Sequence, residues 1–224
     1  MKLILTSDIH GTKPELPECD ILIIAGDIFN TLDPTKQFKQ LYNIFMPWLA
    51  ELKYKHCVFI AGNHDTLFQS VPMWIPSFKD LNAVYLQDDM VEIEGVKIFG
   101  TPWQLHFGNL AFNAPEDGEE FLERRYSIIP EDVDIIISHG PPYGYGDLNF
   151  HDENCGSKAL LNTIRKIQPK LVVTGHIHNA QGIYYIGKTT VVNAASTAIE
   201  DDKRYVVNPD KSYFVFDWET GEVK

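Results

Sequence analysis

The 224-residue chain has few cysteines, no long apolar segment and few basic residues. Its three cysteines, Cys19, Cys57 and Cys155, are an odd number at wide spacing, which excludes a disulfide-based scaffold and favours a reducing environment. No apolar run approaches the ~18 residues of a membrane-spanning helix. The first apolar run reaches Asp8 too soon for a signal peptide. We therefore expect a soluble, cytoplasmic protein.

The chain is also short of positive charge, with 19 Lys and Arg against 31 Asp and Glu and a formal net charge of −12. Such a chain repels a nucleic-acid backbone or an anionic membrane, so neither is expected as a partner. The composition, 44% hydrophobic and 22% charged, is typical of a globular protein. Because no linker, internal repeat or low-complexity segment interrupts it, we expect one domain over residues 1–224.

Short apolar, β-branched runs recur along the chain and are continuous, as in strands buried on both faces. These predicted strands are Leu3–Leu5, Ile21–Ala25, Val58–Ala61, Ile135–Ile137 and Leu171–Val173. Between them, apolar residues at helical spacing predict helices over Thr35–Leu52, Glu116–Tyr126 and Ser157–Ile167. Strands that alternate with helices predict a layered α/β fold.

Two turn signals predict antiparallel hairpins and hence mixed sheets. Glu94-Gly95 and Gly187-Lys188 each separate two apolar runs. Tyr213–Phe216 is predicted to be the last strand. The polar segment Asp201–Lys211, which contains a proline, is predicted to be a surface loop.

Each of the five predicted buried strands is followed at once by Asp, Asn or His. These residues are Asp8 and His10, Asp27, Asn63 and His64, His139, and His176 and His178. The carboxyl ends of strands in an open α/β sheet form the ligand crevice, so we expect these side chains to meet at one edge. Any one of these residues alone is typical of a turn or of a polar side chain with ordinary hydrogen bonds. Five such strand ends together predict a metal-binding site.

Imidazole and carboxylate ligands without thiolate suit Mn, Fe, Zn, Ni or Co, and we favour Mn. Asp8 and His10, like His176 and His178, stand two residues apart, so in extended chain both side chains of a pair point to one face. The candidate ligands are more numerous than the four usual for one zinc-like ion, which predicts two divalent ions.

Other residues with suggestive side chains lack this context. His56 and His106 are predicted to be surface or structural residues, and His151 to lie in a loop. Trp103 has two open interpretations, core packing or a wall of the substrate pocket.

The motif order Asp-x-His, Gly-Asp, Gly-Asn-His-Asp, His-Gly, Gly-His-x-His resembles the calcineurin-like metallophosphoesterase superfamily. The resemblance implies a four-layer αββα sandwich of two mixed β-sheets flanked by helices, with two metals at the strand ends. It also implies that His64 meets the substrate. The ligand sets it implies are Asp8, His10, Asp27 and His178 for one metal, and Asn63, His139 and His176, with Asp27 as the bridge, for the other.

Further segments look like the small MPPED-type metallophosphodiesterases, among them Val84–Asp88, Thr101–Trp103 and His139–Gly144. That likeness implies phosphodiesters, including cyclic nucleotides, as candidate substrates. The chain departs from the superfamily at Asn30, where many members have an acid that orients the substrate-side histidine. Whether Asp65 takes over that role is left open.

The resemblance implies hydrolysis by a hydroxide that bridges the two metals, with His64 as general acid and Asp27 as the bridging ligand. Two divalent ions, Asp8, Asp27 and the hydroxide leave a net charge of about +1, which matches a phosphodiester monoanion. The predicted substrate contacts are Asn63, His64, Trp103, Pro141, Pro142 and Tyr143. The alternatives are a phosphomonoesterase on small substrates and a non-catalytic interaction module on the same fold. The sequence does not identify an oligomeric state.

Overall fold

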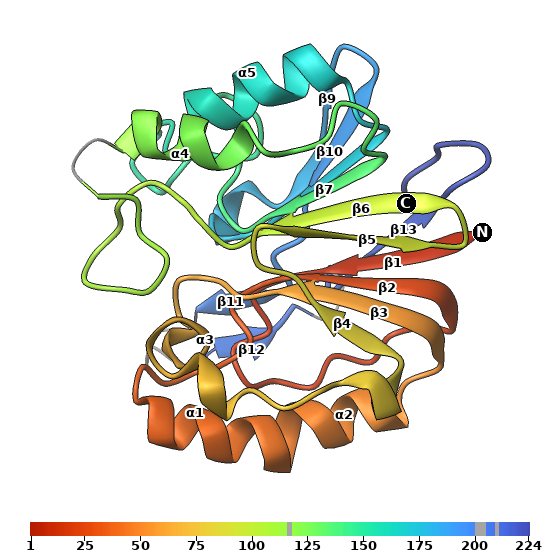
Figure 1. Ribbon diagram of the computed structural model, residues 1–224, viewed down its shortest axis with the longest axis vertical. Coiled ribbons are helices and arrows are strands. Elements are labelled where there is room, and N and C mark those ends of the chain that lie inside the picture. The colour runs from red at the N-terminus through yellow and green to blue at the C-terminus, as the bar shows by residue number, and fades with distance from the viewer. Residues whose placement is uncertain (116–117, 200–204, 209–210) are drawn as a thin grey trace.

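The computed structural model describes residues 1–115, 118–199, 205–208 and 211–224. Its two mixed β-sheets stack face to face and carry helices on their outer faces (Figure 1), so the predicted αββα sandwich is confirmed. The first sheet has the order β13 (Phe214–Asp217), β1 (Lys2–Thr6), β2 (Cys19–Ala25), β3 (Tyr54–Ile60), β4 (Ala83–Tyr85). The second has the order β5 (Asp89–Ile93), β6 (Val96–Thr101), β7 (Ile135–Ser138), β8 (Leu171–Thr174), β10 (Thr189–Asn193), β9 (Gly182–Ile186).

The central strands are apolar on both faces because both faces are covered. In β1, Leu3 and Leu5 pack in the core between the sheets, with Ile135 and Ile137 of β7. Ile4, which points the other way, packs in the core beneath the helices of the first sheet. This burial explains why the strands read as continuous apolar runs.

The predicted helix over Thr35–Leu52 is three consecutive pieces, α1 (Pro34–Gln40), a π-helical turn (Leu41–Phe45) and α2 (Met46–Glu51). Asp33 caps α1 by accepting from two backbone N–H groups, with Pro34 in the first turn. Pro47 has no N–H with which to continue the regular α-helical hydrogen bonding. Just before it, the N–H of Met46 donates to the carbonyl of Leu41, five residues back, as in a π-helix. The helical spacing was therefore right, but it does not reveal this local widening.

The helices α4 (Gly118–Tyr126) and α5 (Lys158–Ile167) cover the outer face of the second sheet (Figure 1). Ser157 caps α5 by accepting from the N–H of Leu160 at 3.1 Å. Residues 116–117, included in the predicted helix, lie outside the described residues. Between β3 and β4 lie α3 (Thr66–Ser70) and two short 3₁₀ turns, Pro72–Trp74 and Lys79–Leu81. No helix in the described ranges has the length and apolar character needed to cross a bilayer.

Both hairpins, β5–β6 and β9–β10, are antiparallel as predicted, and β13 pairs antiparallel with β1. The loop predicted over 201–211 is wrong in its middle. There β12 (Tyr205–Val207) pairs with β11 (Thr197–Ile199), while 201–204 and 209–210 lie outside the described residues. Three-residue strands leave too short a pattern for sequence reasoning to detect.

Candidate metal centre

The structure brings the seven predicted ligands and His64 together at the carboxyl ends of the parallel strands, on the left in Figure 1. Asp8, Asp27 and Asn63 follow β1, β2 and β3, whereas His139 and His176 follow β7 and β8 of the other sheet. The site therefore lies where the two sheets meet. The most deeply buried members, each at most 2% exposed, are Asp8, His10, Asp27, Asn63 and His139.

One group of donor atoms is formed by Asp8, His10 and His178. The Nε2 atom of His178 lies 3.2 Å from Oδ1 of Asp8 and 3.3 Å from Nε2 of His10. One donor atom from each of the three lies within 4.8 Å of the others. A carboxylate and two imidazoles at this spacing are a suitable ligand set for a divalent transition ion.

A second group is centred on the amide oxygen of Asn63. That Oδ1 lies 2.8 Å from Nε2 of His139 and 2.8 Å from Nδ1 of His176. Here the imidazole nitrogens are in hydrogen-bond contact with the amide oxygen, and after loss of their protons the same three atoms could bind a cation. The two groups are adjacent, since donor atoms of Asp8, Asp27 and His139 also lie within 4.8 Å of one another.

Asp27 stands between the two groups. Its Oδ2 lies 3.7 Å from Nε2 of His10, and its Oδ1 lies 3.4 Å from Nε2 of His139. Oδ1 also accepts the backbone N–H of His64 at 2.7 Å. One carboxylate therefore faces both groups, with a different oxygen toward each.

Backbone carbonyls orient the buried imidazoles. Nδ1 of His10 lies 3.2 Å from the carbonyl of Phe29, and Nδ1 of His139 lies 2.8 Å from that of Ala25. A carbonyl only accepts, so each Nδ1 carries its proton and donates, which leaves Nε2 to face the site. Metal-binding histidines are commonly oriented in this way. The donor set therefore fits divalent cations in both chemistry and orientation.

The charges in the site are strongly coupled. Burial opposes ionisation of Asp8, but the neighbouring His178 outweighs it and lowers the pKa of Asp8 to about 2. Burial also opposes the charged form of His139, yet Asp27 raises the pKa of that imidazole to about 9. Burial lowers the pKa of His10 to about 4 and, helped by His139, that of His176 to about 3. Two carboxylates thus require positive charge beside them, from protons or from cations.

The backbone is strained where it presents these side chains. Asp8, His10, Asp27 and His176 all have positive φ, at 55°, 42°, 54° and 69°. Such conformations are uncommon for residues other than glycine and cost about 1–3 kcal/mol each. Gly62 is required for a different reason, since a Cβ there would collide with Oδ1 of Asp27.

Two buried residues that sequence reasoning did not assign to the site hold its loops. Gln37 of α1 is fully buried, and its Nε2 donates to the carbonyl of His64 at 2.6 Å. Asp65, also fully buried, accepts the N–H groups of Ile28, Phe29 and Gly62 at 2.8–3.1 Å. Asp65 therefore joins the loop after β2 to the loop after β3. The Asn30 side chain, at the position where the resemblance implies an acid in many members, accepts from Gln40.

A pocket of about 500 Å³ opens beside the centre. It is lined by Asp27, Asn63, His64, Leu105, His106, Phe107, Asn149, Phe150, His151, Cys155, His176, Ile177, His178 and Asn179. Asn63 and His64, predicted as substrate contacts, are among these residues. For the other lining residues, the one signal in the sequence was the presence of aromatic residues next to histidines. These residues lie in loops, which have no periodic pattern from which their positions can be predicted.

The other predicted substrate contacts, Trp103, Pro141, Pro142 and Tyr143, are not among the residues that line this pocket. Trp103 donates from Nε1 to Asp88 at 2.9 Å and packs edge-on against Phe112 and Phe121. Of its two interpretations, packing is the one that the contacts match. His106 and His151 also line the pocket. The sequence predicts His106 to be a surface or structural residue and His151 to be a loop residue, and both are exposed in the structure.

A model of the calcineurin-like phosphoesterase family matches residues 1–180. Human "Metallophosphoesterase domain-containing protein 1" is 38% identical over 220 residues, which cover 87% of this chain and 65% of the human protein. The chain thus spans under two thirds of that relative. The Caenorhabditis elegans "UPF0046 protein C25E10.12" is 33% identical over 206 residues, 84% of this chain and 70% of the worm protein.

Solved structures show the same fold. The crystal structure of TT1561 of Thermus thermophilus superposes with a TM-score of 0.60 at 12% identity, over 100% of this chain and 96% of that one. Another solved chain reaches a TM-score of 0.69 at 16% identity, over 100% of this chain and 97% of its own length.

Proposed function

The chain belongs to the calcineurin-like phosphoesterase family, and from this membership and the site geometry we propose that it is a dinuclear metal-dependent phosphodiesterase. Its proposed substrates are small phosphodiesters such as cyclic nucleotides. The observation that carries the proposal is the position of Asp27, whose two carboxylate oxygens face two separate groups of donor atoms. A carboxylate in this position could contact two ions at once.

The proposed ligands divide between the two groups. Asp8, His10, Asp27 and His178 would hold one ion, and Asp27, Asn63, His139 and His176 would hold the other. Manganese is the proposed metal, in a donor set that also suits iron, zinc, nickel or cobalt. When bound, such ions would neutralise phosphoryl charge and lower the pKa of a bound water.

His64 is the proposed general acid. Its ring lies edge-on to His10, with ring centroids 4.7 Å apart, and its side chain lines the pocket. Its backbone is held on one side by Asp27 and on the other by Gln37. In this position a protonated His64 gives its proton to the departing alkoxide, a role typically worth about 10²–10⁴-fold in rate.

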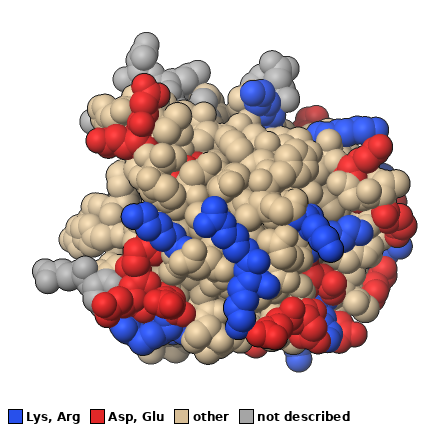
Figure 2. Space-filling model, turned by 90° about the horizontal axis from the view of Figure 1, so that it is seen from above, with Lys and Arg blue, Asp and Glu red and all other residues tan. Residues whose placement is uncertain are grey.

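The charge of the pocket favours a diester over a monoester. Its described lining contains neither lysine nor arginine, so no basic side chain adds to the charge of the proposed ions to bind a second phosphoryl charge. Figure 2 shows the face above α4 and α5, where basic and acidic side chains both occur. The lack of lysine and arginine in the described pocket lining supports a small substrate rather than a long nucleic acid.

A cytoplasmic location is also proposed. Cys19, Cys57 and Cys155 are all free thiols, and the first two are buried. Free thiols are typical of proteins kept in a reducing compartment.

The test is turnover of an aryl phosphodiester and the matching aryl monoester by metal-free protein reconstituted with Mn²⁺. We expect hydrolysis of the diester to exceed that of the monoester and to disappear with chelator. Faster monoester turnover would make the protein a phosphomonoesterase. No turnover of either ester with both ions bound would favour a non-catalytic module.

A further inference from the structure

Two exposed phenylalanines line the pocket beside the proposed centre. Phe107 is 60% exposed and Phe150 is 76% exposed, although both are large and apolar. Phe107 stands edge-on against the ring of His176, with centroids 5.5 Å apart. The two residues come from different loops, one after β6 and one after β7. Exposed apolar side chains at the mouth of a pocket are typical of a ligand contact.

The loop that carries Phe107 is held in place by side-chain amides. Oδ1 of Asn113 accepts the N–H of Phe107 at 3.1 Å and Nε2 of Gln104 at 3.0 Å. Nδ2 of Asn113 donates to the carbonyl of Gly108 at 2.9 Å. The loop is also tied to the centre, because the N–H of Ala111 donates to the carbonyl of Asn63 at 2.9 Å. An exposed phenylalanine on such a fixed loop loses little conformational freedom when it binds.

The loop that carries Phe150 is fixed in the same way. Oδ1 of Asn149 accepts the N–H groups of His151 and Glu153 at 2.8 and 3.0 Å. Nδ2 of Asn179, next to the proposed ligand His178, donates to the carbonyl of Leu148 at 2.7 Å. Each phenylalanine loop is therefore hydrogen-bonded to a segment that carries a proposed metal ligand.

We propose that Phe107 and Phe150 recognise the uncharged, planar organic group of the substrate, an aromatic ring or a nucleobase, an inference that rests on the proposed function. The rings of the two residues offer apolar and π contact beside the place where the phosphoryl group binds. Leu105 and Ile177 add apolar surface to the same pocket. Without lysine or arginine in the described lining, the pocket selects a neutral group rather than a second phosphate.

The test compares phenylphosphonate with methylphosphonate, which share a headgroup and have phosphorus–carbon bonds that a phosphodiesterase does not cleave. Titration calorimetry of the Mn²⁺-reconstituted protein measures both affinities. We expect phenylphosphonate to bind about tenfold more tightly, because its ring can stack on the two phenylalanines and the phosphonate headgroup is the same in both compounds. Phe107→Ala and Phe150→Ala should each reduce this preference to about threefold or less, with the affinity for methylphosphonate unchanged.

Tyr185→Ala is the matched control, because Tyr185 is an aromatic residue of β9 that is 66% exposed and lies outside the pocket. It should leave the preference for phenylphosphonate intact. Equal binding of the two phosphonates, no binding of phenylphosphonate, or an unchanged preference in both phenylalanine variants overturns the inference. A wild-type protein that keeps the preference but hydrolyses no phosphoester contradicts the proposed reaction and leaves the subsite standing.

Discussion

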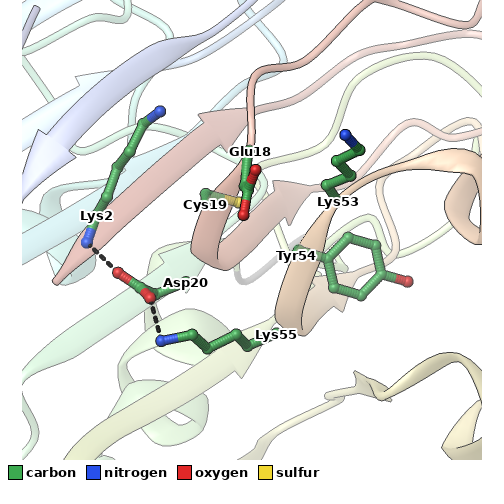
Figure 3. A pocket seen from close by; sticks show the side chains of 7 residues that line it. All are labelled: Lys2, Glu18, Cys19, Asp20, Lys53, Tyr54 and Lys55. Atoms are coloured by element: carbon green, nitrogen blue, oxygen red, sulfur yellow. Dashed lines mark hydrogen bonds and ion pairs between the residues drawn. The ribbon is translucent and has the colours of Figure 1, made fainter.

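At the amino ends of β1, β2 and β3, ionisable side chains surround an open hollow, whereas at the carboxyl ends of the same strands they are buried in the candidate metal centre. The hollow, about 370 Å³, is lined by Lys2, Glu18, Cys19, Asp20, Lys53, Tyr54 and Lys55 (Figure 3). There Asp20 pairs with Lys55 and accepts the N–H of Lys2. At the carboxyl edge, Asp8 and Asp27 are at most 2% exposed and face imidazoles.

The two edges show how a surface cavity differs from a candidate functional site. At the amino edge, opposite charges satisfy one another in water, since the Lys55 side chain is 63% exposed. At the carboxyl edge, lone pairs converge in a buried space on strained backbone. Each edge has a cavity of several hundred Å³, so the presence of a cavity does not by itself identify function. The convergence of buried donor atoms does.

The largest expected difference between the edges concerns their carboxylates. Asp27→Asn preserves the shape of the side chain but removes the charge that faces both donor groups. We expect kcat to fall by at least about 10³-fold, with loss of bound Mn²⁺ measured by elemental analysis. Asp20→Asn is the control at the amino edge and should change neither value. An active Asp27→Asn protein with two bound ions would contradict the bridging role.

Loss of the proposed general acid should have the next largest effect. His64→Ala should lower kcat by about 10²–10⁴-fold while bound Mn²⁺ stays the same. The defect should be smaller for a p-nitrophenyl ester than for an alkyl ester, because a good leaving group needs less protonation. His56→Ala, at an exposed histidine of β3 near Glu94, is the control and should retain full activity. Equal defects on both esters would assign His64 to binding instead.

Removal of the metal should make the stability of the carboxyl edge depend on pH, because protons then supply the positive charge beside its carboxylates. The pKa of Asp8 is lowered, so its ionised form stabilises the fold above about pH 4, and this contribution is lost as the pH falls through about 2. The pKa of His139 is raised, so its protonated form stabilises the fold below about pH 6.5, and this contribution is lost as the pH rises through about 9. The pKa values of His10 and His176 are lowered, so their neutral forms stabilise the fold above about pH 6.5, and this contribution is lost as the pH falls toward about 4 and 3. Metal-free protein should therefore be most stable near about pH 6.5 and lose stability on either side.

Urea unfolding from pH 3 to pH 10, with chelator or with excess Mn²⁺, measures this effect. At pH 9, Mn²⁺ at 100 times its Kd should add about 3 kcal/mol to the free energy of unfolding. At pH 5 the gain should shrink, because protons compete for the histidines. A gain that does not vary with pH would argue against histidine ligation.

The positions of the ligands could be predicted from sequence because a strand end fixes a place in the fold. Asp8, Asp27 and Asn63 each follow an apolar run that is buried on both faces, and parallel strands bring such ends to one edge. The expected meeting of Asp8, Asp27, Asn63, His139 and His176 agrees with the structure. Their roles as ligands stay predictions.

The surroundings of the centre could not be predicted, for physical reasons. Gln37 is a polar residue on the apolar side of its helix. Its hydrogen bond to the carbonyl of His64 is visible only in the folded structure. Phe107 and Phe150 lie on loops whose shape depends on side-chain amides far along the chain. The assignment of the pocket wall to Trp103 and Tyr143 relied on residue type, which carries no information about direction.

The smallest expected effect is at the amino edge. Lys55→Ala removes the ion pair with Asp20, in which the lysine is 63% exposed and the carboxylate is half-buried, so salt screens the pair. We expect no change in kcat/KM or in bound Mn²⁺, and a urea midpoint at about 0.15 M salt within error of the wild type. Lys2→Ala, another lysine of the same hollow, should behave alike, because Asp20 accepts from the backbone N–H of Lys2 and not from its side chain. A fall in kcat/KM beyond about twofold in either variant would mean that the amino edge contributes to catalysis, and the distinction between the two edges would no longer hold.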